Sequence, residues 1–172
     1  MLKWLGAGLV IFGSTAIGTA MTTELKRRVG QLQELRKMIV ALQGEIRYGN
    51  ATLNMAFRHV AARIKPPYRQ FLEHTAAQME EFRGEGLAEI FEQNLRRDLQ
   101  GTALKPEDLE LLGRLGESLG YLDVKTQMDS LDLFLEQLGR LCAEAEKEMH
   151  SKAKVYHYLG VTGGLFLALI LI

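Results

Sequence analysis

The side chains that most often do chemistry are few in this sequence, and they are scattered. The four histidines lie far apart, at His59, His74, His150 and His157. None follows a glutamate by three positions, so the Glu-x-x-His pattern of di-iron bundles is absent. The His-Glu-x-x-His zinc motif and the Gly-rich Lys-Ser/Thr phosphate loop are absent too. A single cysteine, Cys142, excludes an intramolecular disulfide and a multi-cysteine zinc site. We therefore predict that the chain is not an enzyme and has no catalytic, metal-binding or cofactor-binding residue.

A few acidic side chains are the remaining candidates for a functional surface. Glu80, Glu81 and Glu85 flank a predicted turn and are our first choice for a partner-docking face. The alternative interpretation is that these surface acids are only solvated. Glu45 lies on the shoulder of an apolar helix seam, where it either pairs or caps within a helical bundle or lines an interface.

The composition limits the class of protein. The chain has 172 residues, with 21 Lys and Arg against 21 Asp and Glu. This balance argues against a nucleic-acid-binding protein, which normally carries a basic excess. Hydrophobic residues at 47% and charged residues at 24% exclude wholesale disorder. Only three prolines, among many Leu, Ala, Glu and Arg, favour helices.

Both ends of the sequence are apolar. No charged side chain occurs in the 20 residues between Lys3 and Glu24, or in the 18 residues after Lys154. As helices, these stretches would reach about 30 Å and 27 Å, which matches the hydrocarbon core of a bilayer. We therefore predict two transmembrane helices around a water-exposed middle.

This pattern divides the chain into a transmembrane helix at 1–23, a helical bundle at 24–154 and a second transmembrane helix at 155–172. The first stretch also has the features of a cleaved signal peptide, and the second could be a buried core helix. Basic residues flank both stretches on their inner sides, at Lys26, Arg27, Arg28, Lys147, Lys152 and Lys154. By the positive-inside rule, the middle domain is predicted to be cytoplasmic, with both termini outside.

The middle of the chain is predicted to be helical throughout. Apolar residues recur at helical spacing between glycine or proline breaks, which predicts helices at about 25–48, 53–64, 68–82, 87–100, 106–119 and from 124 onward. Pro106 suits a first helical turn, and Asp123 can cap the last helix. That helix carries Leu131, Leu135 and Leu138 inward and continues into the second apolar stretch without a break.

A glycine turn followed by an early leucine and an aromatic residue occurs twice, at 49–57 and at 84–91. The fold class is therefore predicted as all-α: a six-helix bundle of two related three-helix halves, flanked by N- and C-terminal transmembrane helices.

Several segments resemble the stage III sporulation protein AB family. These are Leu42-Gln43-Gly44-Glu45-Ile46-Arg47-Tyr48-Gly49, then Leu119-Gly120-Tyr121-Leu122-Asp123 with Gln127, and Lys154-Val155-Tyr156-His157-Tyr158-Leu159-Gly160. A short apolar span with a basic flank precedes them, so the resemblance covers nearly the whole chain in order. It implies structural roles for Glu45, Tyr48, Gly49, Gly120, Asp123 and Gln127.

The resemblance also implies a location and partners. Such proteins lie in the mother-cell membrane around the forespore, within an assembly thought to form a channel between the two cells. Their cytoplasmic domain is similar to the platform domains of secretion machines. The expected partners are a cytoplasmic ring ATPase, other membrane subunits of the channel and membrane lipid, with no nucleic acid. A membrane-anchored signalling or sensor module is the alternative.

Overall fold

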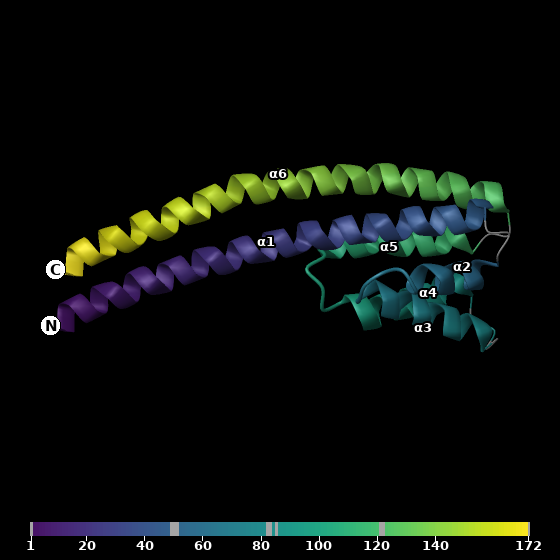
Figure 1. Cartoon of the computed structure of the whole chain (residues 1–172), viewed down its shortest axis with the longest axis horizontal. Coiled ribbons are helices and arrows are strands. Elements are labelled where there is room, and N and C mark those ends of the chain that lie inside the picture. The colour runs from purple at the N-terminus through teal and green to yellow at the C-terminus, as the bar shows by residue number, and fades with distance from the viewer. Residues whose placement is uncertain (1, 49–51, 82–83, 85, 121–122, 172) are drawn as a thin grey trace. The chain divides into compact units, whose positions relative to one another are not determined.

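The computed structural model describes the backbone of residues 2–48, 52–81, 84, 86–120 and 123–171. In the two long helices it describes side chains mainly from Ala20 to Tyr48 and from Val124 to Val155. Within these ranges the chain is all-helical (Figure 1). The helices are α1 (Leu2–Tyr48), α2 (Leu53–Ala61), α3 (Tyr68–Glu80), α4 (Leu87–Leu99), α5 (Pro106–Leu119) and α6 (Val124–Leu171).

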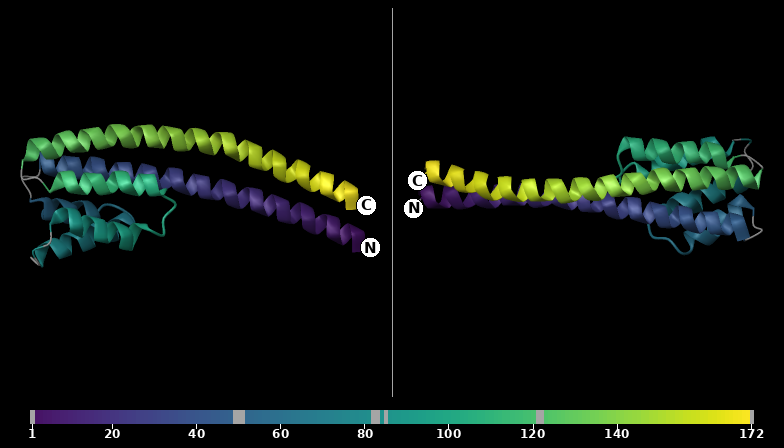
Figure 2. Two further views of the ribbon diagram at one scale, coloured as in Figure 1. Left: turned by 180° about the vertical axis from the view of Figure 1, so that it is seen from behind. Right: turned by 90° about the horizontal axis from the view of Figure 1, so that it is seen from above.

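The chain divides into two compact units. The first comprises Met1–Val29 with Ala143–Ile172, and the second is Gly30–Cys142. In the first unit, the start of α1 and the end of α6 lie at the same end (Figures 1 and 2). Nη1 of Arg28 lies 3.4 Å from Oε2 of Glu148. Lys152 Nζ donates to the other oxygen of Glu148 at 2.6 Å. The Glu148 carboxylate therefore contacts one cation of α1 and one of α6.

Among the residues that the structure describes, no helix has an apolar segment of the length needed to cross a bilayer. The two predicted spans, 1–23 and 155–172, therefore remain predictions.

The second unit is held together by the apolar faces of its helices. On α1 the buried positions follow the three- and four-residue steps expected for one helix face, at Leu32, Leu35, Met38, Ile39 and Leu42. Between the short helices lies an aromatic cluster. The ring of Phe91 is 4.8 Å from that of Phe71, edge to face, and 6.4 Å from that of Phe57. Each of these three rings is at most 1% exposed.

A glycine allows α5 to pass close to α4. A Cβ atom built on Gly116 would lie 2.6 Å from Cγ and 2.9 Å from Cβ of Phe91. Both distances are far below the van der Waals separation of carbon atoms, about 3.5–4.0 Å. The contact between the two helices therefore requires the absence of a side chain at this position.

Local hydrogen bonds explain where the helices begin. Thr52 Oγ1 accepts from the Met55 N–H at 3.5 Å at the start of α2. Asp108 Oδ2 accepts from the Lys105 N–H at 2.9 Å and fixes the entry to α5, where Pro106 takes the first helical position. At α6, Asp123 Oδ2 accepts from the Thr126 N–H at 3.0 Å.

The structure corrects two local predictions. The second helix was expected to reach Ile64, but α2 ends at Ala61, because the chain must turn before Pro66 and Pro67. Leu135 was expected in the core, but it is only half-buried. Phe134 is buried instead at 4% exposure, because the inward face of α6 is rotated by about one residue there.

Candidate interaction surface

Glu45 joins α1 to α2 and to the turn that follows it. Its carboxylate lies 2.9 Å from Nδ1 of His59 and 3.2 Å from Nη1 of Arg63. The Glu45 side chain is 15% exposed, so it is largely enclosed by these partners. These contacts agree with the interpretation that Glu45 pairs within the bundle.

Three further predicted residues meet at the connection between α5 and α6. The Gly120 N–H donates to the Glu117 carbonyl at 3.3 Å as α5 ends. The buried Gln127 donates from Nε2 to the Leu119 carbonyl at 3.0 Å, and Asp123 provides the N-cap of α6. The contact from Gln127 ties the end of α5 to the start of α6.

The remaining predicted structural residues lie apart from this connection. Tyr48 is 80% exposed at the end of α1, so its side chain belongs to the surface. Gly49 lies outside the described residues.

The structure describes two of the three predicted docking acids. Glu80 already forms a bidentate pair with Arg58, across α3 and α2, at 2.5 and 3.1 Å. Glu81 is exposed. Glu85 lies outside the described residues. Since exposed pairs contribute only about 0–1 kcal/mol, Glu80 can exchange Arg58 for a partner's cation at little cost.

Sequence reasoning missed a second cluster of charged side chains, which lies between α3 and α4 and is centred on the carboxylate of Asp98. Asp98 Oδ2 lies 2.9 Å from Nδ1 of His74, and Oδ1 accepts from Nε of Arg97 at 3.1 Å. Partial burial acts to raise the pKa of Asp98, but the hydrogen bonds from Arg97 and His74 outweigh it and hold that pKa below its ordinary value. No motif predicted this cluster, because His74 and Asp98 are 24 positions apart.

A hollow of about 310 Å³ lies between α5 and α6. Its apolar side chains are Leu111, Leu115, Leu133 and Phe134, and its polar ones are Arg114, Ser118, Ser130 and Gln137. Leu133 is 54% exposed there. Among the described residues, no group of three His, Cys, Asp or Glu side chains could hold a metal ion.

Within the described residues the protein is all-helical, and the side chains of Glu45, Glu80, Asp98 and Gln127 join one helix to another. The family model for Stage III sporulation protein AB matches residues 3–172. The chain therefore belongs to the stage III sporulation protein AB family, as its sequence motifs predicted.

Two relatives agree with this assignment. Stage III sporulation protein AB of Bacillus subtilis (strain 168) is 30% identical over 172 residues, which cover 99% of both chains. A solved structure of Stage III sporulation protein AB (SpoIIIAB) is 27% identical, with a TM-score of 0.66. The match covers 72% of this chain and 97% of that one.

Proposed function

We propose that the protein is a membrane-anchored platform subunit of a sporulation-specific, secretion-like channel between mother cell and forespore. In this proposal the helical domain lies in the mother-cell cytoplasm and docks a ring ATPase. The observation that carries it is the family match over residues 3–172, together with the sequence resemblance to secretion platforms. A platform of this kind binds other protein chains and needs no catalytic site.

Membrane anchoring is supported by the sequence of both ends. The uncharged stretches of 20 and 18 residues have the length of bilayer spans. Basic residues follow the first stretch and precede the second, as expected for a cytoplasmic middle.

Cysteine accessibility tests this topology in sporulating cells. In a Cys142→Ala background, a cysteine placed at Gln70 should be protected from a membrane-impermeant reagent, and one placed before Trp4 should be labelled. N-terminal sequencing of the extracted protein should find the first stretch retained. A mature start near Met21, or labelling at position 70 in intact cells, would refute the two-span arrangement.

Docking of an ATPase is supported by the exposed acids at the end of α3. Contacts between surface charges weaken with salt, because the Debye length falls from about 10 Å at 0.1 M to about 3 Å at 1 M. We therefore expect the ATPase to bind the domain at low salt and to dissociate as salt rises.

Calorimetric titration of the purified protein with the ATPase of the same complex measures this directly. The variant Glu80→Lys/Glu81→Lys/Glu85→Lys should lose binding. A matched control, Glu73→Lys/Glu110→Lys/Glu136→Lys, reverses three acids elsewhere and should retain it. Absence of binding at low salt, with both proteins folded, would refute the docking. Equal binding by both triple variants would refute only the proposed face.

A further inference from the structure

One end of the Gly30–Cys142 unit is basic. The α2–α3 and α4–α5 connections both lie at this end (Figure 1), and Gln31 of α1 is bonded to Tyr68 and to Ala103. The Tyr68 hydroxyl donates to the Gln31 carbonyl at 2.9 Å, and the Ala103 N–H donates to Gln31 Oε1 at 2.6 Å. Residues 62–70 and 95–108 hold six Lys or Arg and three acidic residues, in a chain with no net charge.

Two cations of this basic end have no carboxylate partner among the described residues. Lys65 is exposed, and Arg69 is exposed while its Nε donates to the carbonyl of Ile64 at 3.0 Å. Of the three acids in these segments, Asp98 is shared by Arg97 and His74, and Asp108 accepts from the Lys105 N–H. The end therefore presents positive charge that the fold itself does not neutralise.

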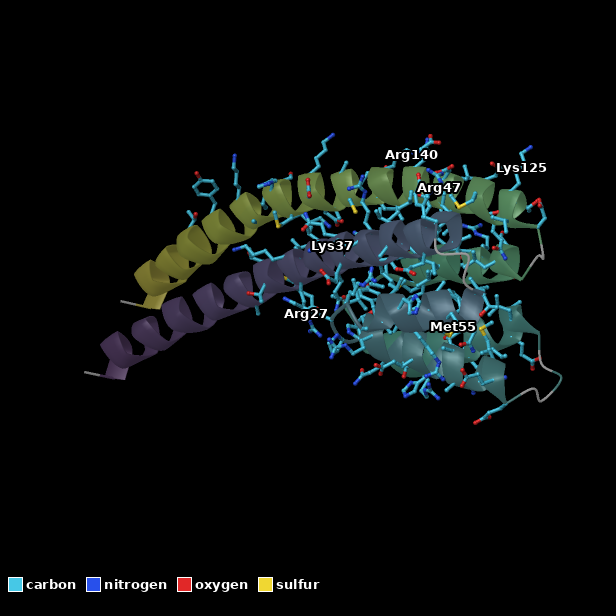
Figure 3. All side chains as sticks on the ribbon, turned by 45° about the vertical axis from the view of Figure 1, so that its right-hand side comes forward. Arg27, Lys37, Arg47, Met55, Lys125 and Arg140 are labelled. Carbon is cyan, nitrogen blue, oxygen red and sulfur yellow. The ribbon has the colours of Figure 1, made fainter. Side chains whose placement is uncertain are left out.

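The opposite end of the same unit is acidic. There α3 ends, α4 begins, α5 ends and α6 begins (Figure 1). The exposed acids described at this end are Glu81, Glu89, Glu117, Asp123 and Asp129. Lys125 lies at the same end, at the start of α6 (Figure 3). The unit is thus polarised from a basic end to an acidic end.

The two ends differ in their separation along the sequence from the first apolar stretch. Gln31, which is bonded to the basic end, follows Thr23 by eight residues. Tyr48, at the acidic end, follows Thr23 by 25 residues. The field of a charged membrane decays over about 8 Å at physiological salt, so the end with the shorter tether to the predicted span is the better placed to reach it.

We propose that the basic end, with Lys65 and Arg69 at its centre, binds the phosphate headgroups of anionic lipids. This inference rests on the proposed membrane anchoring. Headgroup binding orients the domain on the bilayer and leaves the acidic end, with Glu80 and Glu81, directed at the cytoplasm. The same polarity that draws one end to the membrane repels the other from it.

Energy transfer in lipid nanodiscs tests the proposal with the full chain. A donor dye is attached at Gln70→Cys in a Cys142→Ala background, and an acceptor dye is carried by the lipid. Transfer should be higher in phosphatidylglycerol-containing discs than in phosphatidylcholine discs, and salt should remove the difference. Each cation near an anionic surface contributes about 1 kcal/mol, so removing two should lower the docking constant about 30-fold.

Matched variants separate charge from structure. The difference between lipids should vanish in Lys65→Glu/Arg69→Glu and persist in Lys65→Arg/Arg69→Lys. It should also persist in Arg114→Glu/Lys125→Glu, which reverses two cations away from the basic end.

The outcomes also separate this proposal from membrane anchoring itself. A chain that fails to enter nanodiscs would refute the anchoring and this inference together. A chain that enters them but shows equal transfer in both lipids would refute the inference alone. So would transfer that rises only when an acidic partner protein is added.

Discussion

Two glycines on α5 should respond in opposite ways to the same substitution. Gly116→Ala would bring a methyl group within 2.6 Å of Cγ of Phe91. Phe91 has no free space to enter, because it is 1% exposed and lies edge to face against Phe71 at 4.8 Å. Gly113→Ala meets only the carboxylate Oε2 of Glu92, at 3.1 Å, and this flexible side chain can move away.

The magnitudes decide the sign of each effect. Replacing glycine by alanine inside a helix gains about 1 kcal/mol of intrinsic propensity, which both variants receive. Overpacking a well-filled core costs about 1–3 kcal/mol, which only Gly116→Ala incurs. We therefore expect Gly116→Ala to lower the free energy of unfolding by up to about 2 kcal/mol and Gly113→Ala to raise it by up to about 1 kcal/mol.

Urea denaturation of fragment 24–154, followed by circular dichroism, measures both values under one set of conditions. The two variants should differ by about 1–3 kcal/mol, the cost of overpacking, at an unchanged m-value. Gly139→Ala, where no atom lies within 4 Å, is a second control and should stabilise like Gly113→Ala. If Gly116→Ala stabilises the fragment as much as the controls do, the close packing of α5 on α4 is wrong.

Further predictions concern the same fragment. Fragment 24–154 should give a strongly helical spectrum and a cooperative melt, and a random-coil spectrum would contradict an independent domain. Leu131→Ala should cost about 2–5 kcal/mol because the side chain is fully buried, whereas Leu133→Ala, at a half-exposed site two residues away, should cost under about 1 kcal/mol. The pKa of Asp98 is lowered in the folded state, so its stabilising effect is full above its unfolded pKa of about 3.9 and is lost as the pH falls through the lower folded pKa. Acid titration of stability should therefore be shallower in Asp98→Asn, and identical curves for both proteins would show that the contacts of Asp98 with Arg97 and His74 contribute nothing.

Much of the fold follows from local patterns. The spacing of Leu32, Leu35 and Leu42 predicts one buried face of a helix, and that face is buried. Pro106 and Asp123 mark helix starts because each suits a first turn by its own geometry, whatever the rest of the chain does.

What sequence reasoning missed depends on packing between distant segments. One residue on a helix turns the face by about 100°, so choosing Phe134 rather than Leu135 for the core required knowledge of the facing helix. Glu45 and His59 are 14 positions apart, and His74 and Asp98 are 24 apart. Such pairs are created by the way helices cross, and no spacing rule within one helix contains that information.

Cys142 is 8% exposed and is the one cysteine of the sequence. The reactivity of its thiol can therefore report local opening of α6. A thiol reagent reaches this sulfur only when α6 locally separates from its neighbours, so the rate of modification reports the population of opened molecules. If opening costs about 5 kcal/mol, roughly one molecule in 5,000 is reactive at a given moment. Any partner that clamps α6 would slow this reaction in proportion to its occupancy, and binding could then be followed on the native sequence without an added label.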